Sequence, residues 1–416
     1  MKNKINIIIA VATTIFCYCL SSCQPNTSHA SMQQAATSIQ TQQTAKEVKP
    51  KNIELGAQDT AAYFNLLKGK NVGLTANATS VVEGKHLLDF LLENGITVKK
   101  IFAPEHGFRG DAEPGQTVNS TIDPKTNVKI ASLFGKTKKP TTEMLKDIDI
   151  MVYDMQSVGV RFFTYISTMH YVMEACAENN IPVIILDRPN PNIDYTDGPI
   201  RNQDAISFVS TDPIPLVYGT TDGELAKMIN GEGWLKNGVK CNLTIIPVKN
   251  YDRKTKYIPP VKPSPNLPNY LSIRLYPSLC LFEATVLSVG RGTDRPFTSV
   301  GYPNANFGEY VFTPQEKPGM MTNPKHKSKK CYGTDFSALN PDSIKFTLKY
   351  FFDYNKKCKE NNIKMIDRPE FLKLLYGNNS LAEMLDKEIS ESQIKQSYAD
   401  ELKNFIEKRK KYLIYK

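Results

Sequence analysis

Three polar segments of this 416-residue chain combine side chains that catalyse reactions or bind anions. Pro104–Gly110 holds a glutamate, a histidine and an arginine, Gln156–Arg161 holds a glutamine and an arginine, and Arg188–Pro191 holds an arginine and an asparagine. Carboxyl and imidazole groups act as general acids and bases, and guanidinium groups bind carboxylates through paired hydrogen bonds. These residue types suit acid–base chemistry, provided that the fold brings the three segments together.

Each polar segment follows an apolar run that predicts a β-strand. The expected strands are Asn71–Ala76, Val98–Ala103, Ile148–Asp154 and Pro182–Asp187, and helices are expected at His86–Glu93 and Phe163–Asn179. Continuous aliphatic and β-branched residues, as in Pro182–Asp187, are typical of a parallel strand buried on both faces. The alternation predicts an α/β fold with a doubly wound sheet, in which ligands bind beyond the carboxyl ends of the strands. The three segments are therefore expected to line one site.

A second, smaller domain is expected after this sheet. A helix over Asp222–Asn230 and a strand over Asn242–Val248 still continue the α/β pattern, whereas the proline-rich Pro259–Pro268 interrupts it. We predict one α/β domain over residues 53–272 and an α+β domain over residues 273–416. The second domain is expected to hold strand-like stretches to about Phe312 and helices at Ser343–Asn355, Glu370–Tyr376 and Glu391–Tyr412.

The N-terminus predicts export and lipid anchoring. A short basic start is followed by the apolar run Ile5–Phe16, which is too short for a stable membrane span and typical of a signal peptide. Leu20–Cys23 resembles a bacterial lipobox, so residues 1–22 are expected to be removed and Cys23 to be lipidated. Residues 23–52 have almost no large apolar side chains and predict a disordered tether. Because Gln24 is not aspartate, we expect the outer membrane, with the protein facing the periplasm.

Several other classes of function are disfavoured. The net charge of +10 and the pI near 9.0 come without a nucleic-acid recognition motif, so no nucleic-acid partner is expected. Gly73–Thr79 has one glycine where a dinucleotide-binding turn needs three, and no GxxxxGK[ST] segment occurs, so no cofactor is expected. The five cysteines that follow Cys23 form no CxxC pair and are expected to be small buried hydrophobes, with no metal site.

Several motifs together resemble one known family. Phe102–Gly110, Tyr153–Tyr165, Asp187–Pro191, Ser264–Pro268 and Ser288–Thr293 resemble, in this order, the motifs of the NamZ family of exo-β-N-acetylmuramidases. The resemblance implies a Rossmann-like catalytic domain over residues 53–272, a smaller C-terminal domain and a cleft between them. It also implies release of N-acetylmuramic acid from the non-reducing end of peptidoglycan fragments, with a muropeptide or disaccharide as the bound partner. Tyr218 departs from the pattern, since a histidine is usual at this position.

The catalytic residues expected from these motifs are Glu105, Asp154 and His106. Glycoside hydrolysis needs an acid that protonates the leaving oxygen and a second group that acts at the anomeric carbon. Glu105 is expected to be the acid, or else to pair only with an arginine. Asp154 is expected to be the base, or to fix His106 or Arg161, and His106 could orient Glu105, bind hydroxyls, move a proton or serve the structure. Glu224 is a third carboxylate that equally suits helix capping.

The substrate's lactyl ether ends in a carboxylate, which favours a guanidinium partner. Arg109, Arg161, Arg188 and Arg291 are the candidates. No more than two of them are expected to contact the substrate, and each could equally form a structural ion pair. Tyr165 could stack on a sugar ring or belong to the core, and the asparagines could bind the acetamido group or form turns. The expected substrate-binding residues are Arg109, Gln156, Arg161, Tyr165, Arg188, Asn190, Asn266 and Arg291.

Three competing functions stay open. A lyase could use the same site with a base and a tyrosine. A non-catalytic peptidoglycan-binding lipoprotein would account for the anchor, the positive charge and the arginines. Hydride transfer is the least favoured function, because the chain lacks a phosphate-binding loop. The motifs leave open the stereochemical course and the oligomeric state.

Overall fold

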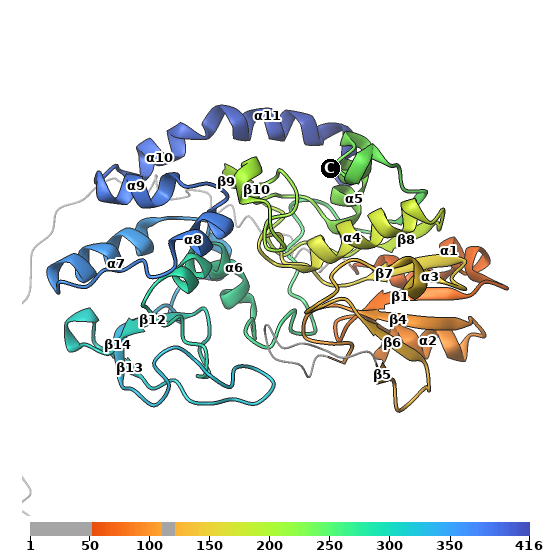
Figure 1. The fold of residues 1–416 in the computed structure, drawn as a ribbon, viewed down its shortest axis with the longest axis horizontal. Coiled ribbons are helices and arrows are strands. Elements are labelled where there is room, and N and C mark those ends of the chain that lie inside the picture. The colour runs from red at the N-terminus through yellow and green to blue at the C-terminus, as the bar shows by residue number, and fades with distance from the viewer. Residues whose placement is uncertain (1–51, 110–120) are drawn as a thin grey trace, which may run out of the picture. The chain divides into compact units, whose positions relative to one another are not determined.

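A seven-stranded sheet forms the centre of the N-terminal half (Figure 1). The computed structural model describes residues 52–109 and 121–416. The strand order is β11-β8-β7-β1-β4-β6-β5, and every neighbouring pair is parallel except β5 with β6. Five predicted strands are confirmed as β1 (Val72–Ala76), β4 (Val98–Ala103), β7 (Ile150–Asp154), β8 (Val183–Leu186) and β11 (Leu243–Ile246). The sheet is completed by β5 (Thr121–Ile122) and β6 (Lys129–Ser132).

Helices cover both faces of this sheet, as a doubly wound fold requires. Alternate side chains of a strand point to opposite faces, and Val152 packs with α1 (Thr60–Leu67) and α2 (Leu87–Glu93) on one face. Its neighbours Met151 and Tyr153 pack on the other face with α3 (Thr142–Leu145), α4 (Tyr165–Glu178) and α5 (Asp222–Glu232). Burial on both faces explains why the strands are apolar throughout. The predicted α/β class is confirmed.

The C-terminal half adds a small sheet and a set of helices (Figure 1). Its antiparallel sheet has the order β12-β14-β13, with β12 (Ser299–Tyr302), β13 (Tyr310–Phe312) and β14 (Cys331–Asp335). The helices are α6 (Tyr270–Leu279), α7 (Lys349–Glu360), α8 (Pro369–Tyr376), α9 (Ser380–Asp386), α10 (Glu391–Ser397) and α11 (Ala399–Arg409). Two further pairs are short, β2 (Val81–Val82) with β3 (Lys85–His86) and β9 (Asp197–Ile200) with β10 (Pro215–Val217).

Two expectations for this half differ from the structure. The segment after residue 272 was expected to be strand-like, but α6 runs across this point, with Asn269 capping its first turn and Pro277 inside it. The internal proline conceals the helix from a pattern reading. The long helix expected over Glu391–Tyr412 is divided into α10 and α11 at Tyr398, whose backbone is not helical and whose hydroxyl donates to Asp197.

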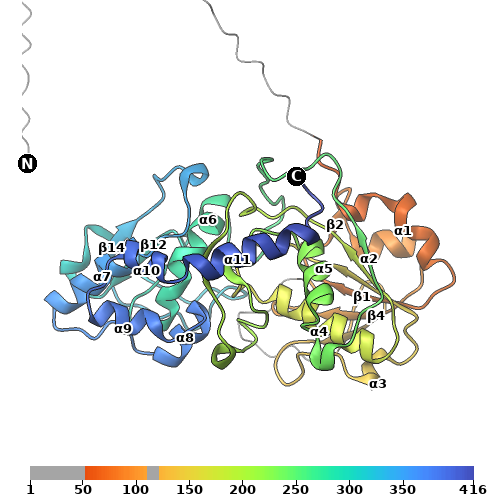
Figure 2. The same ribbon diagram turned by 90° about the horizontal axis from the view of Figure 1, so that it is seen from above.

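The C-terminal end of the chain packs on the first domain. Figure 2 shows α11 crossing above the molecule toward α5. Beyond it, the buried Tyr415 hydroxyl donates to Asp187 at 2.7 Å, and the backbone N–H groups of Ile414 and Tyr415 donate to Glu224. The last residues of the expected second domain therefore complete the helix-covered face of the first.

The described cysteines are all buried and free, as predicted for small hydrophobes: Cys176, Cys241, Cys280, Cys331 and Cys358. Within residues 52–109 and 121–416, no helix has both the length and the apolar character that a bilayer span needs.

Candidate active site

A cavity of about 420 Å³ is lined by residues from both halves of the chain, and we call it the Glu105 cavity. The N-terminal half contributes Glu105 and His106 after β4, and residues 162–165 at the start of α4. Residues 264–267 of the proline-rich segment form another wall. The C-terminal half contributes residues from α6, from the Arg291 loop and from α8. This volume suits a single sugar unit, because ligand pockets start at roughly 300 Å³.

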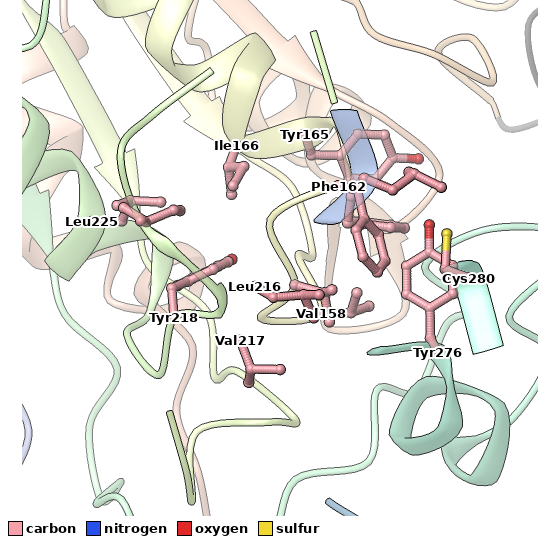
Figure 3. Packing of buried hydrophobic residues seen from close by; sticks show 14 of the residues in the cluster. Val158, Phe162, Tyr165, Ile166, Leu216, Val217, Tyr218, Leu225, Tyr276 and Cys280 are labelled. Atoms are coloured by element: carbon pink, nitrogen blue, oxygen red, sulfur yellow. The ribbon is translucent and has the colours of Figure 1, made fainter. Parts of the chain in front are cut away.

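Aromatic rings hold the two halves together beside the cavity. Figure 3 shows Phe162 from the loop before α4 next to Tyr276 from α6. Their ring centroids lie 5.1 Å apart in an edge-to-face arrangement, and Tyr276 packs in the same way on Phe297 at 4.9 Å. All three rings are buried and line the cavity. Edge-to-face contacts of this kind stabilise the wall beyond the burial of area alone.

Glu105 is half-buried and lies at the carboxyl end of β4. The Thr164 hydroxyl donates to Glu105 Oε2 at 2.7 Å, so the turn that begins α4 orients this carboxyl group. His106 follows with a φ of 68°, a left-handed conformation that is uncommon for a residue other than glycine. Its Nε2 lies 3.4 Å from the Ser264 hydroxyl oxygen, at the opposite wall. The structure therefore brings Glu105 and His106 together in one cavity.

Asn266 lines the cavity and has one unused acceptor. Its side-chain nitrogen donates to the Met320 carbonyl at 2.9 Å, and its Oδ1 is buried with no hydrogen-bond partner among the described residues. Because a carbonyl only accepts, this bond fixes which end of the amide is nitrogen. Tyr165 lines the cavity too, and its hydroxyl donates to the Pro263 carbonyl at 3.2 Å. Burial raises the pKa of Tyr165, so the hydroxyl stays a donor.

Charged residues of the C-terminal half complete the cavity. Arg291 Nε donates to Glu283 Oε1 at 3.0 Å, and its guanidinium lies 5.0 Å from the Phe297 ring centroid. Burial acts to lower the pKa of Arg291, but the charge of Glu283 and its hydrogen bond to Arg291 together raise the pKa. Arg368 lines the cavity with its guanidinium 4.2 Å from the ring centroid of Phe371. Sequence reasoning missed Glu283 and Arg368, which lie outside every recognised motif.

Asp154 lies outside the cavity, in a buried ion pair. It is 0% exposed, and both Nε and Nη2 of Arg188 donate to its carboxylate, Nη2 at 2.8 Å. Asp154 therefore fixes Arg188, and neither His106 nor Arg161 as the sequence had suggested. Among the described residues, the carboxylates that line the Glu105 cavity are Glu105 and Glu283.

Arg188 and Gln156 line a second cavity of about 360 Å³. Gln156 donates to the Pro189 carbonyl at 2.8 Å, while its buried Oε1 has no hydrogen-bond partner among the described residues. A third cavity of about 560 Å³ shares Thr79 with this one and His106 and Tyr165 with the Glu105 cavity. The three cavities therefore follow one another along the carboxyl edge of the sheet.

Two of the expected arginines lie elsewhere. Arg161 is fully buried and donates to four backbone carbonyls, of Pro199, Ile214, Leu375 and Tyr376. Burial lowers its pKa to about 9. Arg109 is exposed and pairs with Asp123 through Nε at 3.0 Å and Nη2 at 2.9 Å. Neither residue lines the Glu105 cavity.

Asn190 and Glu224 also lie outside the cavity, in structural networks. Asn190 donates to the Thr220 carbonyl and accepts from the Asn192 backbone, which is the turn alternative that the sequence left open. Glu224 is 0% exposed and forms a capping box with Thr221 at the start of α5. Its capping role is confirmed. Cys23 lies outside the described residues.

Comparison with known proteins identifies the family. The N-terminal model of the exo-β-N-acetylmuramidase NamZ matches residues 72–271, and the C-terminal model matches residues 274–415. The chain belongs to the NamZ family. It is 39% identical, over 90% of its length and 93% of the relative's, to the peptidoglycan β-N-acetylmuramidase NamZ of Bacillus subtilis (strain 168).

Solved structures of the family share this fold. Two crystal structures of DUF1343-family proteins from Bacteroides fragilis NCTC 9343 match 88% of this chain. The first has 43% identity, a TM-score of 0.81 and 99% of its own chain covered, and the second has 30% identity, a TM-score of 0.77 and 100% covered. Tyr218, which departs from the motif pattern described above, is buried and packs in the core shown in Figure 3. No group of three or more potential metal ligands occurs among the residues described.

Proposed function

We propose that this protein is an exo-acting glycosidase that releases N-acetylmuramic acid from the non-reducing end of peptidoglycan fragments, in cell-wall turnover or recycling. Membership of the NamZ family supports the reaction and the substrate class. The observation that carries the proposal is the position of Glu105, in a cavity of about 420 Å³ walled by both family domains. The cavity has room for one terminal sugar.

Glu105 is the proposed general acid. Its carboxyl group is half-buried and oriented by Thr164, which donates to one oxygen. Protonation of the glycosidic oxygen by Glu105 lets the leaving sugar depart as an alcohol. Water then adds at the anomeric carbon, and the proton that it releases restores the Glu105 acid. Glu283 is the second carboxylate of the cavity, and its ion pair with Arg291 fixes it in place. Asp154 has a positioning role instead, through its pair with Arg188.

We assign the terminal sugar and the leaving sugar to two different cavities. Asn266, which lines the cavity and whose buried Oδ1 has no hydrogen-bond partner among the described residues, is the acceptor that we assign to the acetamido N–H of the terminal sugar. The adjoining cavity of about 560 Å³ receives the leaving sugar across the wall made by His106 and Tyr165. Its proline-rich lining offers flat apolar surface to a sugar ring.

The test is Glu105→Gln, which keeps the shape of the side chain and removes the proton donor. On a disaccharide with terminal N-acetylmuramic acid, we expect turnover to fall by about a hundred-fold or more, as for the loss of a general acid. On a nitrophenyl N-acetylmuramide the loss should be smaller, because this leaving group needs no protonation. Glu309→Gln is the matched control, since Glu309 is exposed and lies outside the cavity.

The same assay separates the competing functions. A product lighter by one water would identify a lyase. Full function of Glu105→Gln on the natural disaccharide would overturn the assignment of the acid. Binding without any turnover of the wild-type protein would favour a non-catalytic peptidoglycan-binding lipoprotein.

We also propose that a lipid on Cys23 anchors the protein to the outer membrane, facing the periplasm. The basic start, the short apolar run and the lipobox-like Leu20–Cys23 support this localisation, and the polar residues 24–50 supply the tether. Cys23→Ser should move the protein from the membrane fraction to the soluble fraction of the producing cell. Retention of the variant in membranes, together with a wild-type chain that carries no acyl mass, would contradict the anchor.

A further inference from the structure

We propose that Arg368, at the start of α8, binds the lactyl carboxylate of N-acetylmuramic acid and thereby selects this sugar over N-acetylglucosamine. The inference rests on the proposed muramidase function and assigns a specificity role to a residue outside the family motifs.

The sequence contains ten arginines, and all ten lie in the described residues. Nine of them are engaged through the guanidinium. Arg109, Arg188, Arg253, Arg274, Arg291 and Arg295 form ion pairs, and Arg161, Arg201 and Arg409 donate to backbone carbonyls or hydroxyls. The guanidinium of Arg368 has no ion pair and no hydrogen bond to any residue that the structure describes, and its side chain contacts the Phe371 ring.

The backbone of Arg368 is fixed, and its exposed side chain lies against the Phe371 ring. Its backbone N–H donates to the Ala284 carbonyl at 3.2 Å, and its carbonyl accepts from the Leu372 N–H at 3.0 Å as the first turn of α8 forms. Phe371 supports the guanidinium face at 4.2 Å. An arginine held in this way offers its planar donors to a carboxylate with little further loss of conformational freedom.

The charges of the Glu105 cavity also favour Arg368 as the anion partner. The charged residues that line it are Glu105, Glu283, Arg291 and Arg368. Glu283 and Arg291 neutralise each other at 3.0 Å, so a carboxylate that approached Arg291 would also approach Glu283. Arg368 forms no ion pair with a described carboxylate, and a bound lactate group would supply that partner.

The test varies the charge of the substrate and of the residue together. The substrates are p-nitrophenyl β-N-acetylmuramide and its lactyl methyl ester, which has almost the same shape and no charge. For the wild type we expect kcat/KM to favour the acid by about ten- to hundred-fold, as for a charge-assisted hydrogen-bonded pair. In Arg368→Ala this preference should disappear, through KM rather than kcat, and Arg368→Lys should keep part of it. Turnover of the ester should be nearly unchanged.

Two controls keep the result specific. Arg295→Ala removes an arginine that pairs with Asp335 and does not line the cavity, so it should keep the preference for the acid. Melting temperatures identify variants that fail to fold, and the lysine variant then replaces the alanine variant. An unchanged preference in Arg368→Ala would overturn the proposal, as would a preference that is lost only in Arg291→Lys.

A binding measurement separates this inference from the proposed function. Calorimetric titration with free N-acetylmuramic acid and with N-acetylglucosamine needs no catalysis. If the wild type binds the first sugar more tightly and Arg368→Ala does not, the assignment of Arg368 stands even if the protein hydrolyses nothing. If the wild type hydrolyses muramides but Arg368→Ala binds both sugars as the wild type does, the assignment fails while the proposed function stands.

Discussion

The buried His170 should make the stability of this protein depend on pH. His170 lies in α4, is 5% exposed and faces two carboxylates, with Nδ1 2.8 Å from Asp212 Oδ1 and Nε2 3.6 Å from Glu174 Oε2. Lys139 also contacts Glu174, at 2.6 Å. Burial alone would lower the pKa of His170, but Asp212 and then Glu174 raise it from 6.5 to about 9.

The size and sign of the effect follow from this pKa. In the unfolded chain His170 loses its proton near pH 6.5, whereas in the folded protein it keeps the proton to about pH 9. The stability that the imidazolium contributes is therefore fully present below about pH 6.5 and is lost as the pH rises through about 9. At roughly 1.4 kcal/mol per pKa unit, the contribution is about 3 kcal/mol.

The assay is urea unfolding of the wild type and of His170→Gln at about pH 6 and about pH 9.5, where the charge of His170 differs most. We expect the glutamine variant to lose stability relative to the wild type at the lower pH. This loss in the free energy of unfolding should be about 3 kcal/mol greater than the loss at the higher pH. The control is His326→Gln: burial lowers the pKa of His326 in the folded protein, so this variant should not lose more stability at the lower pH than at the higher one. An equal loss for His170→Gln at both pH values would refute the reasoning.

Two further substitutions test the packing around the sheet. Tyr415→Phe removes a hydroxyl that donates to buried Asp187 at 2.7 Å, and should lower the free energy of unfolding by about 1–3 kcal/mol in denaturant titrations; no change would contradict a structural role for the C-terminal end. Gly159→Ala should cost more than about 2 kcal/mol, because φ is +77° and the new Cβ would lie 2.2 Å from Asn190 Oδ1. Gly69→Ala, with φ +70° and nothing within 4 Å, should cost about 1 kcal/mol, and equal losses in the two variants would refute the steric argument.

The sheet could be predicted from the sequence because parallel strands buried on both faces leave continuous apolar runs. The runs at Val98–Ala103 and Ile148–Asp154 correspond to β4 and β7 within two residues at either end. The same reading placed Glu105 and His106 at the carboxyl edge, and the structure puts both in one cavity. Such patterns do not predict the strand order or the partners of each side chain, because these depend on contacts between distant segments.

Asp154 and Arg188 illustrate this limit. Each was recognised as a polar residue at the end of a strand, and each was expected to act on substrate or on a catalytic group. Their strands β7 and β8 are neighbours, so the two side chains meet and neutralise each other below the surface. A sequence pattern assigns a residue to an edge of the sheet, but it does not show which charge lies opposite. Arg368 was missed for the same reason, because it reaches the cavity from a helix far along the chain.

Arg161 lies outside the Glu105 cavity but still helps to determine the geometry of that cavity. Its Nη2 donates to the Tyr376 carbonyl at 2.7 Å and to the Leu375 carbonyl at 3.2 Å. These carbonyls belong to the last turn of α8, which lacks partners within the helix. Leu375 and Arg368 of the same segment line the Glu105 cavity. We therefore infer that Arg161 is a positioning residue: it follows β7 in the first domain and fixes the end of the helix that presents Arg368 from the second.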